Sequence, residues 1–230
     1  MKRLIFFDID GTLTRTQDGY IPFNEAVFKT FGIRGDIRSV IPDGNTDPRI
    51  VEDIFAQANL KLALEEGQWA EFSQNLRECY SNAVRQRATT IRALPGAAAL
   101  LRRIAVTDDF ICSVVTGNLE TTATVKLEAA ELFSYLCRGA YGSDSPHRAD
   151  LPLIAKQRCE HLHHESIPLE RCVIVGDTLK DLEAARQNDM KCVLVGTGRY
   201  PVEELILSQP DRCLPDLCDT AEVIKTLATV

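Results

Sequence analysis

The sequence contains no long apolar segment and no recognisable export signal. No apolar run in its 230 residues approaches the roughly 18 residues of a membrane-spanning helix. Only four apolar residues, at positions 4–7, separate the basic amino terminus from Asp8, and this is too few for the apolar region of a secretory signal. We therefore predict a cytoplasmic protein that has no membrane partner.

Clusters of basic residues are also absent. The chain has 26 Lys and Arg against 33 Asp and Glu, for a net charge of −7, and no run of five or more like charges. Since binding to a phosphate backbone needs clustered Lys and Arg, this composition argues against a nucleic-acid partner. The negative charge would also repel a small anionic substrate, so a site for one needs a local cation or a metal.

Cysteine and histidine do not form a zinc or disulfide pattern. The eight cysteines contain no CxxC pair, and several lie within apolar runs, which is typical of reduced, buried thiols in a cytosolic protein. Three of the four histidines lie at positions 161–164 without Cys or acidic partners at ligand spacing. We interpret them as a polar helix end.

The sequence does contain a repeated alternation of short apolar runs and helix-length segments. The apolar runs are unbroken and rich in branched or aromatic side chains, as in strands buried on both faces of a parallel sheet. They occupy residues 4–7, 110–115, 172–175 and 192–195, with weaker ones at 136–141 and 213–214. The helical segments occupy residues 96–105, 119–131, 150–163 and 179–189. This order predicts an α/β fold with a doubly wound parallel sheet.

Residues 15–89 interrupt this alternation. They contain no convincing buried strand, whereas Trp69, Phe72 and Leu76 begin an amphipathic helical pattern over residues 68–87. A second helix is predicted to begin at Asp47, with proline in its first turn. We predict a small α-helical domain of residues 15–89 inserted into a sheet domain of residues 1–14 and 90–230. The alternative is that these helices only cover one face of the sheet.

Polar residues directly follow three of the apolar runs. In chain order they are Asp8 and Asp10, then Thr116, Gly117 and Asn118, then Asp177 and Asp181. Because ligands of open α/β sheets bind at the carboxyl ends of the strands, we expect these groups to share one crevice. A hydroxyl and backbone amides that open a helix, as at residues 116–118, suit an anion.

Four carboxylates cannot share a dry crevice unless a divalent cation compensates their charge. Oxygen ligands without His or Cys favour Mg²⁺ over zinc. A carboxylate beside Mg²⁺ can attack a phosphoryl group, since the metal neutralises charge that would repel the incoming anion. The product of such an attack is an aspartyl-phosphate.

The order and spacing of these motifs resemble those of the haloacid dehalogenase superfamily of phosphohydrolases. DIDGTL at 8–13 is similar to the first motif of that family, TGN at 116–118 to the second, and GDTLKD at 176–181 to the fourth. The insertion at 15–89 stands where members of the helical-cap type carry their cap. The resemblance implies a Rossmann-like core and a Mg²⁺-dependent phosphatase that acts on a small phosphorylated metabolite.

The resemblance also implies catalytic roles. Asp8 would be the nucleophile, and Asp10 would protonate the leaving oxygen and then act as base toward water. Thr116, together with the amides near Gly117 and Asn118, would hold the phosphoryl oxygens.

The metal site and the third motif follow from the same resemblance. Mg²⁺ would be bound by the Asp8 carboxylate, the main-chain carbonyl of Asp10 and the Asp177 carboxylate, with Asp181 as a ligand or as support behind the ligands. The third motif of the family is a Lys or Arg that neutralises the nucleophile and the phosphate. Arg148 lies in the expected region, in SPHR at 145–148, but no Lys-Pro occurs there. Lys126, nearly three turns along the helix after Thr116, is the alternative, and the two stay open.

Other functions remain open at this point. A phosphomutase would use the same site, and a non-catalytic binding protein could use the same scaffold, although a binding role would not require Asp8, Asp10 and Asp177 together. A dehalogenase is disfavoured, because halide displacement does not need the acid/base group at Asp10. Within the cap, we expect the loop at 44–49, with Asn45 and Arg49, to lie nearest the leaving group. A monomer is the default.

Overall fold

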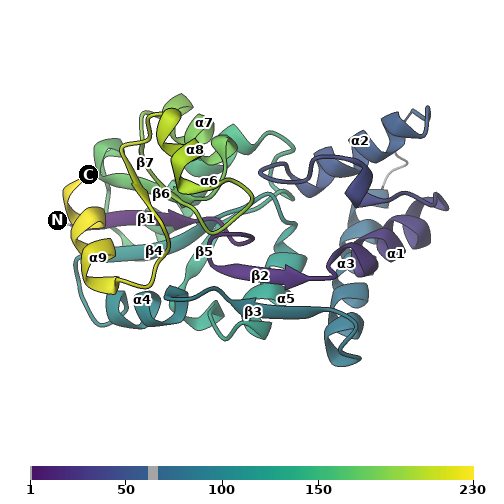
Figure 1. The fold of residues 1–230 in the computed structure, drawn as a ribbon, viewed down its shortest axis with the longest axis horizontal. Helices are drawn as coiled ribbons and strands as arrows, with labels where there is room; N and C mark the ends of the chain where they lie inside the picture. Colours follow the sequence, from purple (N-terminus) through teal and green to yellow (C-terminus); the bar gives the residue numbers. More distant parts are fainter. Residues whose placement is uncertain (1, 62–66) are drawn as a thin grey trace.

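The computed structural model describes residues 2–61 and 67–230, and a six-stranded parallel sheet forms its centre (Figure 1). In spatial order the strands are β5 (Cys137–Ala140), β4 (Phe110–Val115), β1 (Arg3–Phe7), β6 (Cys172–Gly176), β7 (Lys191–Val195) and β8 (Arg212–Leu214). The chain thus starts in the middle of the sheet, builds one side with β4 and β5, and returns to β6 to build the other. This confirms the predicted doubly wound α/β fold, and the point where the strand order reverses is where such folds bind ligands.

Both faces of the sheet are covered by helices, as the unbroken apolar runs predicted. Ile5 and Phe7 of β1 belong to one apolar cluster, whereas Leu4 and Phe6 belong to the other, because successive strand side chains point to opposite faces. The first cluster includes side chains from α4 (Ala97–Ile104), α5 (Glu120–Ala129) and α9 (Thr220–Thr229). The second includes side chains from α6 (Leu151–His163), α7 (Leu179–Gln187) and α8 (Val202–Leu207).

A group of helices lies beyond the carboxyl ends of the strands, on the right in Figure 1. It consists of α1 (Tyr20–Phe31), the 3-10 helix η1 (Ile37–Ser39), α2 (Asp47–Gln57) and α3 (Gln68–Arg85). These helices share an apolar cluster of their own, in which Phe31 packs edge-to-face against Phe55 and Trp69. We call this group the cap; the assignment of residues 15–89 as a separate domain stays a prediction.

An antiparallel pair, β2 (Thr14–Gln17) with β3 (Thr90–Ala93), joins the cap to the sheet. This pair was not expected, because of the four residues of β2 only Thr14 is buried and none is apolar. Three further 3-10 helices, η2 (Phe133–Tyr135), η3 (Arg148–Asp150) and η4 (Leu169–Arg171), lie in the connections of the sheet part.

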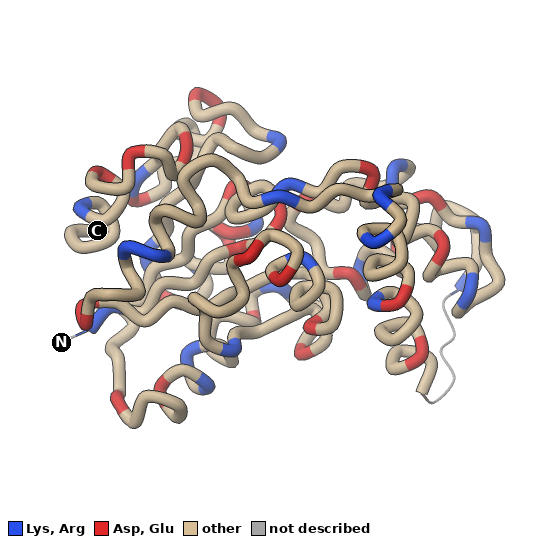
Figure 2. The backbone as a smooth tube through the Cα atoms, turned by 90° about the horizontal axis from the view of Figure 1, so that it is seen from below, with Lys and Arg blue, Asp and Glu red and all other residues tan. Residues whose placement is uncertain are grey.

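The cap rests on α5. Helix α3 packs against α5, with a hydrogen bond of 2.9 Å between the hydroxyls of Ser73 and Thr121. Leu119, the residue before α5, belongs to the apolar cluster of the cap although it comes from the sheet part. Acidic and basic residues are dispersed along the whole backbone (Figure 2), without a block of one sign. Within the described ranges, no helix has the length and apolar character needed to cross a bilayer.

Candidate active site

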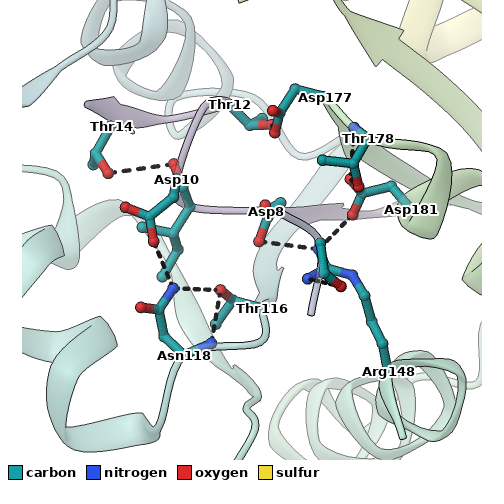
Figure 3. Close-up of polar contacts among 12 residues, drawn as sticks. Asp8, Asp10, Thr12, Thr14, Thr116, Asn118, Arg148, Asp177, Thr178 and Asp181 are labelled. Atoms are coloured by element: carbon teal, nitrogen blue, oxygen red, sulfur yellow. Dashed lines mark hydrogen bonds and ion pairs between the residues drawn. The ribbon is translucent and has the colours of Figure 1, made fainter. Parts of the chain in front are cut away.

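The polar residues that follow β1, β4 and β6 meet at the carboxyl ends of these strands (Figure 3). Asp8 directly follows β1, which is buried between β4 and β6, so the position of its carboxylate is fixed by a rigid strand. Gly11 then turns the chain with φ of 83°, and a Cβ there would lie 2.4 Å from Asp177 Oδ2. Only glycine fits this turn, because it combines a left-handed backbone with close approach to a carboxylate.

Three buried carboxylates form an acidic trio. Asp8, Asp177 and Asp181 each offer an oxygen, and these oxygens lie within 4.8 Å of one another. Burial raises the pKa of Asp8 to about 6, although the charge of Arg148 acts in the opposite direction. Burial and the neighbouring carboxylates Asp8 and Asp181 raise the pKa of Asp177 to about 9. Burial is the main cause of both shifts and the neighbouring carboxylates add to it, so a divalent cation bound here would compensate their negative charge.

The carboxylate of Asp181 is engaged on both oxygens. Its Oδ1 accepts a hydrogen bond from Arg148 Nη2, and its Oδ2 accepts from the backbone N–H of Thr178 at 3.0 Å and from the Thr178 hydroxyl at 2.7 Å. The contact with the Thr178 N–H belongs to the capping box of α7. In addition, Asp177 Oδ1 accepts a hydrogen bond of 3.0 Å from the hydroxyl of Thr12, a residue of the first motif that the sequence did not single out.

Arg148 and Lys126, the two alternatives for the third motif, both lie in the site, and each contacts a different carboxylate. Arg148, in η3, places Nη2 at 3.1 Å from Asp8 Oδ1. Lys126, on α5, places Nζ at 2.6 Å from Asp10 Oδ2 and donates to Asn118 Oδ1 at 2.7 Å. Their exposed fractions are only 8 % and 6 %, which excludes a solvated surface charge in either case.

The charge of Lys126 favours the ionised form of Asp10. Burial alone would raise the pKa of Asp10, but the charge of Lys126, together with hydrogen bonds from Lys126, Asn118 and Thr16, holds this pKa below its usual value. Burial would likewise lower the pKa of Lys126, and the charge of Asp10 reverses this and raises it. The pair is therefore ionised on both sides.

The loop after β4 supplies polar groups beside Asp10. Thr116 is fully buried, and its Oγ1 accepts a hydrogen bond of 2.9 Å from Asn118 Nδ2. The same Nδ2 donates to Asp10 Oδ2 at 2.8 Å. Gly117 passes so close to the cap that a Cβ would lie 2.0 Å from the carbonyl oxygen of Asn45. Thr116, Gly117 and Asn118 of this loop line the cavity, and hydroxyl and amide groups of this kind can bind an anion.

These groups surround one cavity of about 390 Å³ between the sheet and the cap. Of the residues expected in the site, all but Asp181 line it: Asp8, Asp10, Thr116, Gly117, Asn118, Lys126, Arg148 and Asp177. The cap contributes both apolar or aromatic and polar groups: the former include Tyr20, Phe23, Ile37, Ile50 and Tyr80, and the latter Arg38, Asp43, Asn45 and Asp47. The cavity has room for a small organic phosphate.

The cap loop at 44–49 differs from the expectation in part. Asn45 lines the cavity. Arg49 does not line it and instead pairs on the surface with Glu52 and Asp53 at 3.0 and 3.4 Å. Asp47, within this loop, also lines the cavity and is 6 % exposed, although the sequence did not single it out. Its position at the start of a predicted helix resembled an ordinary first-turn carboxylate, so no local signal distinguished it.

Comparisons with known proteins agree with this geometry. Residues 2–189 match the family model of the haloacid dehalogenase-like hydrolases. The sequence is 27 % identical over 217 residues to a protein of Dickeya dadantii named "Probable phosphatase IndB", covering 91 % of this chain and 88 % of that protein. A hydrolase structure from Pseudomonas syringae is similar with a TM-score of 0.70, at 24 % identity and full coverage of both chains. CbbY from Rhodobacter sphaeroides, solved with phosphate, is similar with a TM-score of 0.69, at 18 % identity over 95 % of this chain and 96 % of that one.

Proposed function

The chain belongs to the haloacid dehalogenase-like hydrolase family, and from this premise we propose that it is a phosphatase that cleaves a small phosphomonoester through an aspartyl-phosphate on Asp8. The relative named as a phosphatase, which matches over nine-tenths of this chain, supports assignment to the phosphoric monoester hydrolases. The observation that carries the proposal is the contact between Asp8 and the buried guanidinium of Arg148, within an acidic trio of which Asp8 and Asp177 line the cavity.

We propose Mg²⁺ as the cofactor, because the trio offers only carboxylate oxygens, which are the ligands this ion prefers. Asp8 and Asp177 would hold it, together with the main-chain carbonyl of Asp10. Asp181 has both oxygens engaged by Arg148 and Thr178, so it supports the site from behind. When bound, the metal would neutralise negative charge on the nucleophile and on the phosphoryl group.

In the proposed reaction, a carboxylate oxygen of Asp8 attacks phosphorus, and the bond from phosphorus to the leaving oxygen breaks. Asp10 is ionised beside Lys126, so it would first take up a proton, which a monoanionic phosphate ester can supply, and pass it to that leaving oxygen. It would then take one from the water that hydrolyses the acyl phosphate and regenerates Asp8. Thr116 and the amides of residues 117 and 118 hold the phosphoryl oxygens.

We assign the third-motif role to Arg148 and a separate role to Lys126. Arg148 contacts Asp8, and its buried Nε is left without a protein partner among the residues described, which makes it a free donor for an anion. Lys126 contacts Asp10 and fixes the orientation and ionisation of that carboxylate. The predicted cytoplasmic location and monomeric state stay predictions.

The test is release of inorganic phosphate from a panel of phosphomonoesters that includes an aryl phosphate, with and without Mg²⁺. We expect Mg²⁺-dependent release by the wild type, loss of release in Asp8→Asn with an unchanged circular dichroism spectrum, and normal release in the exposed control Asp108→Asn. Residual activity of Asp8→Asn above about a tenth of normal would refute the nucleophile assignment. Transfer of the phosphoryl group to a second hydroxyl of a sugar phosphate, without release, would identify a phosphomutase.

A further inference from the structure

The start of α2 in the cap is bonded directly to the loop that precedes α5 in the sheet part. The backbone N–H of Asp47 donates to the carbonyl oxygen of Gly117 at 2.8 Å. The carboxylate of Asp47 accepts, through Oδ2, a hydrogen bond of 2.8 Å from the backbone N–H of Leu119. One cap residue thus holds both ends of the segment 117–119, which is part of the proposed phosphate-binding loop.

This contact satisfies one of the backbone N–H groups at the start of α5, which have no partner within the helix. Leu119 is the N-cap residue of α5, and its own side chain makes no capping hydrogen bond. A side-chain oxygen at this position would accept from N–H groups two or three residues further on, so the contact of Asp47 with the N–H of Leu119 itself is a separate one. Leucine stands here since its side chain packs into the apolar cluster of the cap.

Helix α7 of the same protein shows how such an N–H is satisfied within one helix. There the N-cap N–H of Thr178 is accepted by Asp181, three residues along the chain. In α5 the residue at the corresponding position is Thr122, whose buried hydroxyl has no hydrogen-bond partner within the described residues. The carboxylate for α5 comes instead from Asp47, which lies 72 positions earlier in the chain.

The fit at this junction is tight on both sides. Asp47 and its neighbour Thr46 are buried, and the Thr46 hydroxyl donates to the carbonyl oxygen of Pro146 at 2.8 Å, close before Arg148. Gly117 has no room for a side chain, because the backbone of Asn45 lies against it. At this junction the cap therefore contacts directly the two loops that carry the phosphate-binding and cationic groups.

We propose that Asp47 is a positioning residue that couples the closure of the cap to the shape of the phosphate-binding loop. With the cap in place, Asp47 fixes segment 117–119 and the start of α5, and thereby aims Thr116 and the loop amides into the cavity. When the cap moves away, Leu119 N–H loses its acceptor and the loop is no longer held. This inference rests on the proposed phosphatase function, and it concerns binding of the phosphate group itself, whatever the leaving group is.

The first test compares Asp47→Ala with Asp47→Asn, which keeps an amide oxygen as acceptor. Inorganic phosphate is the probe, as a competitive inhibitor of aryl phosphate hydrolysis. We expect Asp47→Ala to weaken phosphate inhibition and to lower kcat/KM at least tenfold, with Asp47→Asn within about threefold of the wild type. Arg49→Ala, on the exposed side of the same helix, is the matched control and should change neither quantity. Phosphate inhibition within twofold of the wild type in a folded Asp47→Ala variant would overturn the proposal, as would equal losses in both Asp47 variants.

The second test needs no variant and does not require turnover. If cap and loop are coupled, inorganic phosphate with Mg²⁺ should slow amide hydrogen exchange in segment 44–50 of the cap as well as in segment 116–122, because coupling between two sites is reciprocal. Protection confined to segment 116–122 would overturn the proposal. A wild type without hydrolytic activity that still shows protection in both segments would refute the proposed function and leave the coupling supported.

Discussion

Replacing Asp47 by asparagine should make the protein more stable at neutral pH, by an amount that follows from its burial. Burial raises the pKa of Asp47 to about 6 from 3.8, against the opposing charge of Lys126 and the hydrogen bond from Leu119 N–H. Because the folded state has the higher pKa, it binds the proton more tightly than the unfolded chain does. Asp47 therefore favours folding most below pH 3.8, and that contribution is lost as the pH rises through 6.

The size of the effect can be worked out from this shift. A difference of about two units at about 1.4 kcal/mol per unit makes ionised Asp47 cost the folded state about 3 kcal/mol well above pH 6. Between pH 5 and pH 8 the expected change is about 1.4 kcal/mol, since part of the cost is already present at pH 5. Asparagine does not titrate, so the difference in unfolding free energy between Asp47→Asn and the wild type should grow by this amount over that range.

Urea denaturation at several pH values, followed by circular dichroism, measures this difference directly. All other titrating groups are common to both proteins and cancel in the comparison. Asp108→Asn, at an exposed position, serves as the control for the loss of a carboxylate. The difference in unfolding free energy between Asp47→Asn and the wild type should grow from pH 5 to pH 8. If it stays constant or shrinks over this range, Asp47 is not a buried carboxyl with a raised pKa.

Two further predictions concern α5. Thr122→Val should raise the free energy of unfolding by about 1 kcal/mol without changing kcat, because it removes a buried hydroxyl that has no partner within the described residues; a loss of stability in urea denaturation would contradict this. Lys126→Met should remove the charge that holds the pKa of Asp10 low, so the limb of the kcat/KM profile that reports Asp10 should move to higher pH, with Lys126→Arg closer to the wild type. A kcat/KM profile in which neither limb is displaced in Lys126→Met would show that Lys126 does not control Asp10.

The strands of the sheet were predictable because burial on both faces leaves an unambiguous pattern. The run at residues 110–115 coincides with β4, and the runs at 4–7, 172–175 and 192–195 each lie within one residue of a strand end. The pair β2 and β3 left no such pattern, since it is short, largely polar and half exposed. Helix α1 was also missed, because its buried side chains are confined to its first two turns.

The carboxylates of the site were predictable for a topological reason. Parallel strands bring their carboxyl ends together, so residues directly after β1, β4 and β6 had to meet. The partners that come from helices and from the cap could not be predicted in the same way. Whether Lys126 reaches Asp10 depends on how α5 packs, and whether Asp47 reaches Leu119 depends on where the cap closes. Both are properties of tertiary packing rather than of spacing along the chain.

The sequence offered Lys126 and Arg148 as alternative cations, and the structure explains why both fitted: each contacts a different carboxylate of the site. Asp8 is buried and Asp10 is half-buried, both line one cavity, and each has a positive group of its own beside it that favours its ionised form. One cation cannot serve both, because Arg148 is already shared between Asp8 and Asp181, while Lys126 is fixed between Asp10 and Asn118. Two buried cations are therefore required by the charge of the site, and even together they leave its carboxylates in excess. Burial, together with the charges of Asp8 and Asp181, raises the pKa of Asp177, and a bound divalent cation would lower this pKa again by compensating those charges.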